Sequence, residues 1–430
     1  MSTQLPIAGR DAAFNDPAVP RADAFETDIH AVLAVARAAY LYLHRNPELG
    51  SAEHKAHAYV KERLGALGCF SIIPSERAPT AVIAVYDTGR PGLVIALRAE
   101  LDARSLDPGT VEPHDHEPRS EIDGLMHNCG HDAHTAMLLA TAHLVAARPG
   151  LFAGRIVFVF QPAEEIGRGA DEIVREGILA RLGVRQIFAL HVAPSLPLGT
   201  AGISPGPRLA GSNYFLLTIK GRGSHAAAPH AGDDLPSVAA RLVEMLTTLP
   251  ARRIDLSNRP MVVSVTRLRA DSGTTNALPA SAELAGTIRA FEDLRVPPPG
   301  ERSLETVITD LIAAVTQAHG VSHEWSLRPS TPATLNDEDL FATIVPEVRR
   351  AWPGMLDVRS RRGMFADDFA YYTQVLPALY FNLGVAQDGF GRSGEHSAEF
   401  TIHPDSLGHG IRLMALLARI ATTGHAGHLP

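Results

Sequence analysis

The first half of the chain alternates amphipathic segments with short apolar runs. Residues 23–42, 51–67 and 134–147 have the apolar spacing of helices. Between them lie brief β-branched runs bounded by Gly or Pro, which are typical of strands buried on both faces: residues 80–85, 93–97, 155–160 and 186–190. This alternation predicts an α/β fold with a mostly parallel sheet and helices on both faces.

The pattern changes after Pro194, where residues 204–211 are rich in Gly and Pro and have the character of a hinge. Beyond it the order strand, helix, strand, strand, helix, strand is typical of a ferredoxin-like α+β sandwich: residues 214–220, 235–249, 261–269, 282–291, 301–319 and 323–327. Further helices are predicted at residues 339–350, 367–374 and 405–422, with a strand at 378–383. We therefore expect residues 206–328 to be inserted into a domain made of residues 1–205 and 329–430.

Composition and charge narrow the classes of function. The chain has 430 residues, of which 45% are hydrophobic and 20% charged, enough for two folded domains. Its formal net charge of −8 leaves no excess of positive charge for nucleic acid. No apolar run reaches the ~18 residues of a membrane helix and no secretion signal precedes the fold, so we expect a cytoplasmic protein that binds neither nucleic acid nor membrane. The two cysteines, Cys69 and Cys129, cannot form a disulfide scaffold.

Histidines gather around a cysteine in the segment MHNCGHDAH, directly before a predicted helix. Cys129 and His131 flank Gly130, a spacing that lets a thiolate and an imidazole converge on one metal ion. Asp132 and His134 are placed to support such ligands from behind. Taken alone, the segment is more simply explained as a polar loop in which Asp132 caps the helix.

Acidic or histidine side chains also follow three of the predicted strands: Glu100 and Asp102, Glu164 and Glu165, and His191. Open α/β sheets bind ligands at the carboxyl ends of their strands. Pro162 ends its strand, so both glutamates after it can turn inward. A solvated acidic turn is the ordinary explanation of a Glu-Glu pair, but three strand ends and a Cys/His loop together favour one shared site.

These residue types suit one or two divalent metal ions. His396, on a Gly-rich loop, is a further candidate, although an isolated loop histidine usually has no function. The complete set offers S, N and O ligands to Zn²⁺ or Mn²⁺ and leaves positions open for water: Cys129, His131, Glu165, His191 and His396. Glu164 would remain free to accept a proton from the activated water and to pass it to a leaving amine. The pattern predicts metal-assisted hydrolysis.

As a set, these motifs resemble the metal-dependent amidohydrolases of the aminoacylase and carboxypeptidase type, in the branch of hippurate, auxin–amino-acid-conjugate and N-acyl-amino-acid hydrolases. The matching stretches span nearly the whole chain: LHRNPELG, MHNCGHDAHTAMLL, FVFQPAEE, LHVAP, IKGRGSHAAAPH, TTNALPASAELAGTIR and DDFAYY. The resemblance implies a catalytic domain with a two-metal site. It also implies that the inserted ferredoxin-like domain forms a homodimer or higher homo-oligomer and acts as a lid.

The resemblance implies a role for each matching residue. The five candidate ligands are metal ligands, Glu164 is the general base, and Asp102 belongs to the catalytic machinery. His225 of GRGSHAA matches a histidine that polarises the scissile carbonyl, often from the partner subunit. Asn276 and Arg289 match positions that contact the carboxylate or carbonyl of the substrate. An arginine can hold a carboxylate through two hydrogen bonds, and an amide or imidazole can stabilise a developing oxyanion.

One stretch departs from the pattern of these relatives. This chain reads RAELDARS where relatives usually read RADMDALP. Asp102 is kept, but Glu100 replaces an aspartate and Arg104 replaces an apolar residue. We expect these two changes to shift substrate preference toward a polar or anionic group, or to change the bond that is cleaved.

The leading hypothesis is hydrolysis of the amide bond of an N-acyl or N-aroyl amino acid, a small-molecule substrate. A hydrolytic deaminase acting on another C–N bond, such as an aromatic amine, is an alternative that the RAELDARS stretch motivates. A dipeptidase differs only in requiring a free substrate amine. A scaffold protein that has lost activity would be expected to lack ligands or base, but this chain keeps Glu164 and all five ligand positions.

Overall fold

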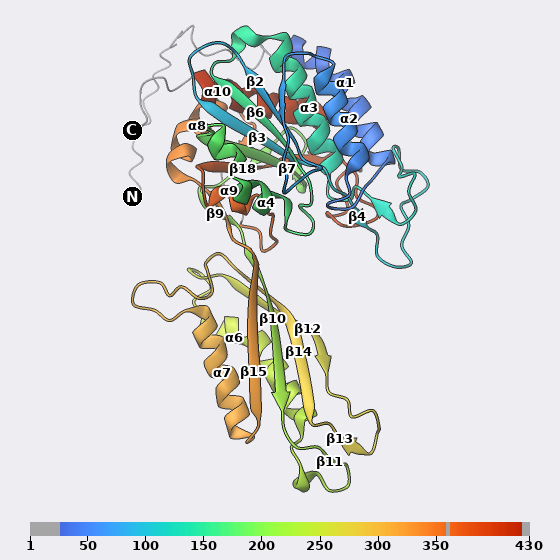
Figure 1. The fold of residues 1–430 in the computed structure, drawn as a ribbon, viewed down its shortest axis with the longest axis vertical. Coiled ribbons are helices and arrows are strands. Elements are labelled where there is room, and N and C mark those ends of the chain that lie inside the picture. The colour runs from blue at the N-terminus through green and yellow to red at the C-terminus, as the bar shows by residue number, and fades with distance from the viewer. Residues whose placement is uncertain (1–25, 358–361, 424–430) are drawn as a thin grey trace, which may run out of the picture.

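The computed structural model describes residues 26–357 and 362–423, which form two lobes joined end to end (Figure 1). Within these residues, the larger lobe is built on an eight-stranded sheet and the smaller lobe on a four-stranded sheet. The first three residues of the first predicted helix, 23–25, lie outside the described residues. None of the described helices is long and apolar enough to cross a membrane.

The larger sheet has a parallel centre, as the alternating pattern predicts. Its strands follow the order β1 (Ser71–Ile73), β2 (Val82–Asp87), β6 (Arg155–Gln161), β3 (Val94–Glu100), β7 (Gln186–Pro197), β18 (Ala378–Ala386), β8 (Ala201–Gly202) and β17 (Leu356–Asp357). The central strands β6, β3, β7 and β18 are parallel, whereas β1 and β2 pair antiparallel at one edge. The carboxyl ends of the central strands therefore meet along one edge of the sheet.

Helices cover both faces of this sheet, which confirms the predicted fold class. Strand β6 illustrates the cause, because Ile156 and Phe158 pack into one apolar core while Val157 and Val159 pack into the other. The first core also takes side chains from α1 (Glu26–Arg45), α2 (His54–Gly65), α3 (His131–Ala147), α8 (Glu338–Ala351) and α10 (Ser406–Thr423). The second core takes side chains from α4 (Gly169–Glu176), α5 (Ile178–Arg181) and α9 (Ala370–Thr373).

The smaller lobe has the expected β-α-β-β-α-β order in its main elements. Its antiparallel strands follow the order β12 (Met261–Arg269), β14 (Ser281–Ala290), β10 (Gly211–Lys220) and β15 (Ser322–Thr331). Helices α6 (Leu235–Arg253) and α7 (Leu304–Ala318) share an apolar core with this sheet, to which Leu242, Ile308 and Leu284 belong. The apolar side chains Leu216 and Val262 of the same sheet are exposed.

Short strand pairs complete the two lobes. Strands β9 (Gly206–Leu209) and β16 (Thr334–Asn336) pair antiparallel where the chain enters and leaves the smaller lobe. Strand β4 (Arg104–Ser105) pairs with β5 (Leu125–Met126) beside the larger sheet. Strand β11 (Ser224–His225) pairs with β13 (Ala277–Leu278) at the end of the smaller lobe that points away from the larger one (Figure 1).

Local differences from the predicted elements have physical causes. Helix α9 is shorter than the predicted 367–374, because Asp367 and Asp368 turn inward and bind the buried Arg98 instead of starting the helix.

Helix α3 begins at His131, three residues earlier than predicted, and Gly130 occupies its N-cap position. Asp132 therefore does not cap this helix, and its carboxylate accepts a hydrogen bond from His44 instead.

Candidate metal centre and active site

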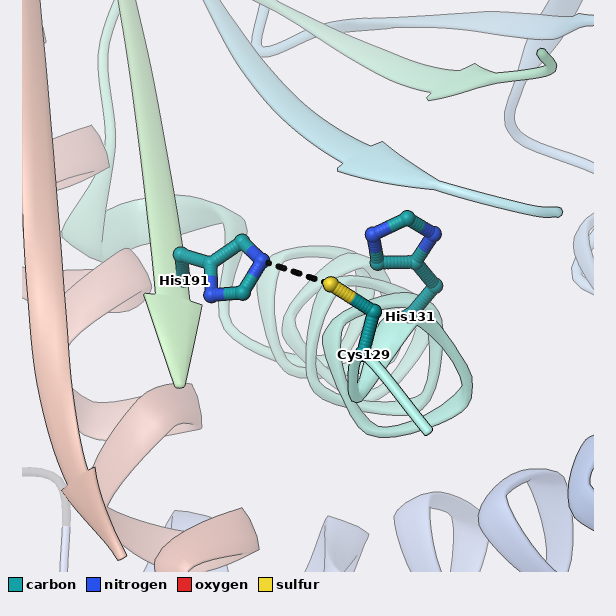
Figure 2. A group of neighbouring side chains, drawn as sticks. All are labelled: Cys129, His131 and His191. Carbon is teal, nitrogen blue, oxygen red and sulfur yellow. Dashed lines mark hydrogen bonds between the residues drawn. The ribbon is translucent and has the colours of Figure 1, made fainter. Parts of the chain in front are cut away.

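Cys129 and His131 reach the site from the tight turn that starts α3. Gly130 between them has φ +84°, and a Cβ there would lie 2.4 Å from a methyl group of Val192, so only glycine fits. The turn directs the Cys129 thiol toward β7, where Sγ lies 3.4 Å from Nε2 of His191 (Figure 2). Three potential ligands from two elements thus face one point.

Asp102 fixes the orientation of two site residues without lining the cavity itself. Its carbonyl oxygen accepts a 2.9 Å hydrogen bond from Nδ1 of His131, which leaves Nε2 of that ring free to bind a ligand. Its carboxylate accepts a 2.9 Å hydrogen bond from the backbone N–H of Glu165. The side chain is fully buried, so it holds both groups from behind.

The two glutamates leave the end of β6 through a strained turn. Pro162 follows the strand, and Ala163 has φ +58°, a conformation that is unfavourable for a residue with a Cβ. The turn is held by the backbone N–H of Ala163, which donates a 2.8 Å hydrogen bond to the Glu53 carboxylate. Both Glu164 and Glu165 consequently line the same cavity, which has a volume of about 420 Å³. Oε2 of Glu164 lies 3.9 Å from Nε2 of His131.

His191 and His396 approach from two other parts of the chain. Nδ1 of His191 donates a 2.7 Å hydrogen bond to the Val192 carbonyl, so Nε2 points into the site with its lone pair. His396 lies on the loop after β18 with φ +71°. Its backbone N–H donates a 2.7 Å hydrogen bond to the Asn128 carbonyl, which ties this loop to the turn that carries Cys129. Nε2 of His396 lies 3.7 Å from Oε1 of Glu165.

Burial and neighbouring charges set the protonation of these groups. Burial raises the pKa of Glu164 well above its usual range, and the nearby Asp367 and Asp368 carboxylates raise it further. Burial also raises the pKa of the Cys129 thiol. For His396, burial and the adjacent Arg104 lower the pKa to about 4, so its ring is neutral at pH 7 and suited to bind a metal ion.

The donor atoms fit divalent cations. Two groups of three ligand atoms each lie within 4.8 Å of one another and share the thiol: Cys129, His131 and His191, and Cys129, Glu165 and His396. Among the described residues, Oδ1 of Asp102, Nε2 of His131 and Oε1 of Glu165 are buried without a hydrogen-bond partner. Unpaired buried polar atoms are costly in a folded protein, and a cation would satisfy those that face the site. All five predicted ligands are thus brought together.

A paired ionic cluster lies directly beside these donors. The fully buried Arg98 binds Glu100, Asp367 and Asp368, with its Nη2 at 2.8 Å from the Asp368 carboxylate. The backbone N–H of Asp368 also lies 3.3 Å from Oε1 of Glu164. No role was predicted for Arg98, Asp367 and Asp368 from the sequence, although an arginine in the apolar run LVIALR and the motif DDFAYY were visible signals.

Glu100 and Arg104, the two departures in RAELDARS, have different places. Glu100 is fully buried, binds Arg98 and His134, and does not line the cavity. Arg104 does line the cavity, and its Nη1 lies 2.9 Å from Oε2 of Glu165.

The three predicted residues of the smaller lobe separate into two places. Arg289, on β14, lines the cavity between the lobes. His225 and Asn276 are exposed at the far end of the smaller lobe, where the Ala226 N–H binds the Asn276 carbonyl at 2.8 Å. Neither residue lines the cavity of its own chain.

Known proteins are similar to this chain in sequence and in fold. The family model for peptidase family M20/M25/M40 matches residues 96–420. A thermostable carboxypeptidase 2 from Saccharolobus solfataricus is 32% identical over 383 residues, which cover 87% of this chain and 92% of that protein. An N-acetylcysteine deacetylase from Bacillus subtilis is 31% identical over 379 residues, which cover 88% of this chain and 94% of that protein.

A solved structure extends the similarity to three dimensions. The YXEP protein of Bacillus subtilis, described as a dinuclear metal-binding peptidase of the M20 family, is 27% identical with a TM-score of 0.76. The match covers 91% of this chain and 98% of that protein. The similarity therefore extends over both lobes.

Proposed function

The chain belongs to peptidase family M20/M25/M40, and we propose that it hydrolyses the amide bond between an acyl group and an amino acid. The N-acetylcysteine deacetylase and the carboxypeptidase act, by their names, on amides whose nitrogen belongs to an amino acid. One observation carries the proposal most directly. The ligand atoms of the five predicted metal-binding residues gather beside a cavity that the carboxylate of Glu164 also lines.

We propose that two divalent cations, Mn²⁺ or Zn²⁺, bind at the two ligand groups that share Cys129. The dinuclear site named for the related Bacillus subtilis peptidase supports this number. When bound, such cations make water more acidic and polarise a carbonyl group. Their ligands would be Cys129, His131, Glu165, His191 and His396.

Glu164 is the proposed proton carrier. Its raised pKa suits a group that first accepts a proton from the attacking water and then releases it. The water oxygen adds to the amide carbon, the C–N bond breaks, and the proton passes from Glu164 to the leaving nitrogen. The products are a carboxylic acid and a free amino acid. Asp102 acts as a positioning residue, since it holds His131 and the Glu165 backbone.

Arg289 is the proposed partner of the substrate's α-carboxylate, because it lines the cavity from the smaller lobe and a guanidinium can hold a carboxylate through two hydrogen bonds. His225 and Asn276 would reach a cavity only from a second copy of the chain. We propose a homodimer through the smaller lobe, where Leu216 and Val262 are exposed on the sheet. Light scattering on the intact chain measures this directly, and a monomer at all concentrations would contradict it.

The function is tested by replacing Glu164 with Gln. We expect the rate of amino-acid release from N-acetyl and N-benzoyl amino acids to fall by ~10²–10⁴, because only the proton-transfer contribution is lost. Bound metal, measured by atomic emission, stays at the wild-type level. Glu62→Gln, at an exposed position on α2, is the matched control.

The same assay includes dipeptides and aryl amines and measures free amino acid and ammonia separately. Ammonia as the sole product would replace the amide hydrolase with a deaminase. Full activity in the Glu164→Gln protein would remove Glu164 from the mechanism.

A further inference from the structure

Arg104 occupies the wall of the cavity beside two of the proposed ligands. It lies on the short strand β4 and pairs with Met126 of β5, three residues before Cys129. Its Nη1 lies 2.9 Å from Oε2 of Glu165 and 2.7 Å from Nδ1 of His396. The side chain is one-third exposed, with a relative accessibility of 34%. The Arg104 side chain therefore already contacts solvent and is free to turn from these contacts toward a ligand in the cavity.

A bound cation and this guanidinium would share the residues Glu165 and His396 but not every atom, because Arg104 contacts Oε2 of Glu165 and leaves Oε1 without a partner among the described residues. Glu165 and His396 belong, with Cys129, to one of the groups that fit a metal ion. The guanidinium keeps its charge at any physiological pH, so it cannot relieve the repulsion by losing a proton. All of these contacts within the described residues use Nη1, so Nη2 and Nε of Arg104 are available to a further partner, and the cavity that Arg104 lines is the open side.

The cavity is lined by two residues with a fixed positive charge and by several acidic residues, which are Glu164, Glu165, Asp367, Asp368 and Glu395. Of the described residues that line it, the arginines are Arg104, from the larger lobe, and Arg289, from the smaller lobe. One N-acyl amino acid has one α-carboxylate, for which Arg289 is proposed above. A second guanidinium in the same cavity can bind a second anionic group of a ligand through its free N–H donors.

We propose that Arg104 binds a second carboxylate of the substrate, so that the preferred substrates are dicarboxylic N-acyl amino acids. This inference rests on the proposed amide hydrolysis. The second carboxylate can belong to the amino acid, as in N-acetylglutamate, or to the acyl group, as in an N-succinyl amino acid. A guanidinium binds both through the same pair of hydrogen bonds.

The test compares kcat/KM for N-acetylglutamate, N-succinylleucine and N-acetylleucine in the wild type and in Arg104→Leu. We expect the ratio of dicarboxylic to monocarboxylic substrate to fall about 10- to 100-fold in Arg104→Leu, the range for losing a hydrogen bond between charged groups. The ratio for Arg104→Lys should lie between those of the wild type and Arg104→Leu, since lysine keeps the charge but loses the paired donors. The dicarboxylic substrate whose ratio falls identifies the group that Arg104 binds. Arg148→Leu, at the exposed end of α3, controls for the change in net charge.

Binding without turnover separates this inference from the proposed function. Metal-loaded protein is titrated with glutarate and with butyrate, and metal content is measured in every variant. We expect the wild type to prefer glutarate and Arg104→Leu to lose that preference. If both the kinetic ratio and the glutarate preference are unchanged in Arg104→Leu, Arg104 serves only to neutralise Glu165 and the inference is wrong. If no amide is cleaved but the glutarate preference still depends on Arg104, the proposed function fails while the carboxylate site stands.

Discussion

Two clusters of buried charged groups lie side by side at the carboxyl ends of the central strands, and they differ in how their atoms are paired. Around Arg98, the carboxylates of Glu100, Asp367 and Asp368 all bind the guanidinium. Around Cys129, ligand atoms of His131 and Glu165 are buried without a partner among the described residues. The first cluster is complete within the protein, whereas the second requires a cation. The groups around Arg98 therefore hold the site in place, whereas the groups around Cys129 are available to bind a metal ion.

The largest stability effect is expected from breaking the complete cluster. Arg98→Met removes the charge that three buried carboxylates share, so the free energy of unfolding should fall by about 3–5 kcal/mol. Urea unfolding of the metal-free proteins measures it. Arg302→Met, which removes an exposed ion pair with Asp310, is the control and should change stability by about 0–1 kcal/mol. Equal effects of the two variants would show that the Arg98 cluster is not structurally important.

The incomplete cluster should instead respond to metal. Adding Mn²⁺ at about 1,000 times its Kd to chelator-treated protein should raise the free energy of unfolding by about 4 kcal/mol, because only the folded state has the assembled ligands. Cys129→Ser should lose most of this gain, since the thiol belongs to both ligand groups. Cys69→Ser, at the exposed cysteine, should keep it. Thermal unfolding with and without chelator provides the measurement, and an equal gain in both variants would contradict the assigned site.

A third buried cluster surrounds His44, whose positive charge, unlike that of Arg98, can be lost as the pH rises. Burial alone lowers the pKa of His44, but hydrogen bonds to Asp132 and Glu112 outweigh burial and raise it to about 9. Protonated His44 therefore stabilises the fold fully below about pH 6.5, the unfolded value, and this contribution is lost as the pH rises through about 9.

The expected loss between pH 6.5 and 9 is about 2–3 kcal/mol relative to His44→Gln, whose side chain does not titrate. The difference in free energy of unfolding between these two proteins, followed across this range, measures it. A difference that stays constant with pH would mean that folding does not raise the pKa of His44. Arg98 itself should contribute no such dependence, since arginine keeps its charge, although burial raises the pKa of Asp368 in the same cluster to about 7.

Elements with a long, regular apolar pattern were predictable from the sequence. Strand β12 begins and ends where predicted, at Met261 and Arg269, and α6 begins at Leu235 as expected. Helices α4 and α5 were not predicted, because they are only 8 and 4 residues long and give too few turns for a periodic signal. Helix α9 was predicted too long, since its first two acidic residues satisfy Arg98 across the core.

The candidate site was predictable as far as strand ends define it. Glu165 follows β6, and β6, β3 and β7 are parallel neighbours, so the proximity of Glu165 to His191 follows from the sheet. His191 itself lies within β7, because this strand continues to Pro197 instead of ending at residue 190 as predicted. The contact between Arg104 and His396 joins positions 292 residues apart, and no local pattern encodes it. The separation of His225 from the cavity likewise depends on how far the smaller lobe extends, which only the structure describes (Figure 1).

The pairing of β9 with β16 bears on how such a protein can be assembled in evolution. The two strands run antiparallel, with Leu209 beside Thr334, so both ends of the smaller lobe meet at one place on the backbone. A short turn between these residues would close an ordinary β-hairpin. The larger sheet would keep every strand and their order, because none of them comes from residues 210–333. The smaller lobe can therefore be gained, lost or exchanged as a module without any change in the strand order of the larger lobe, which carries the metal-ligand residues.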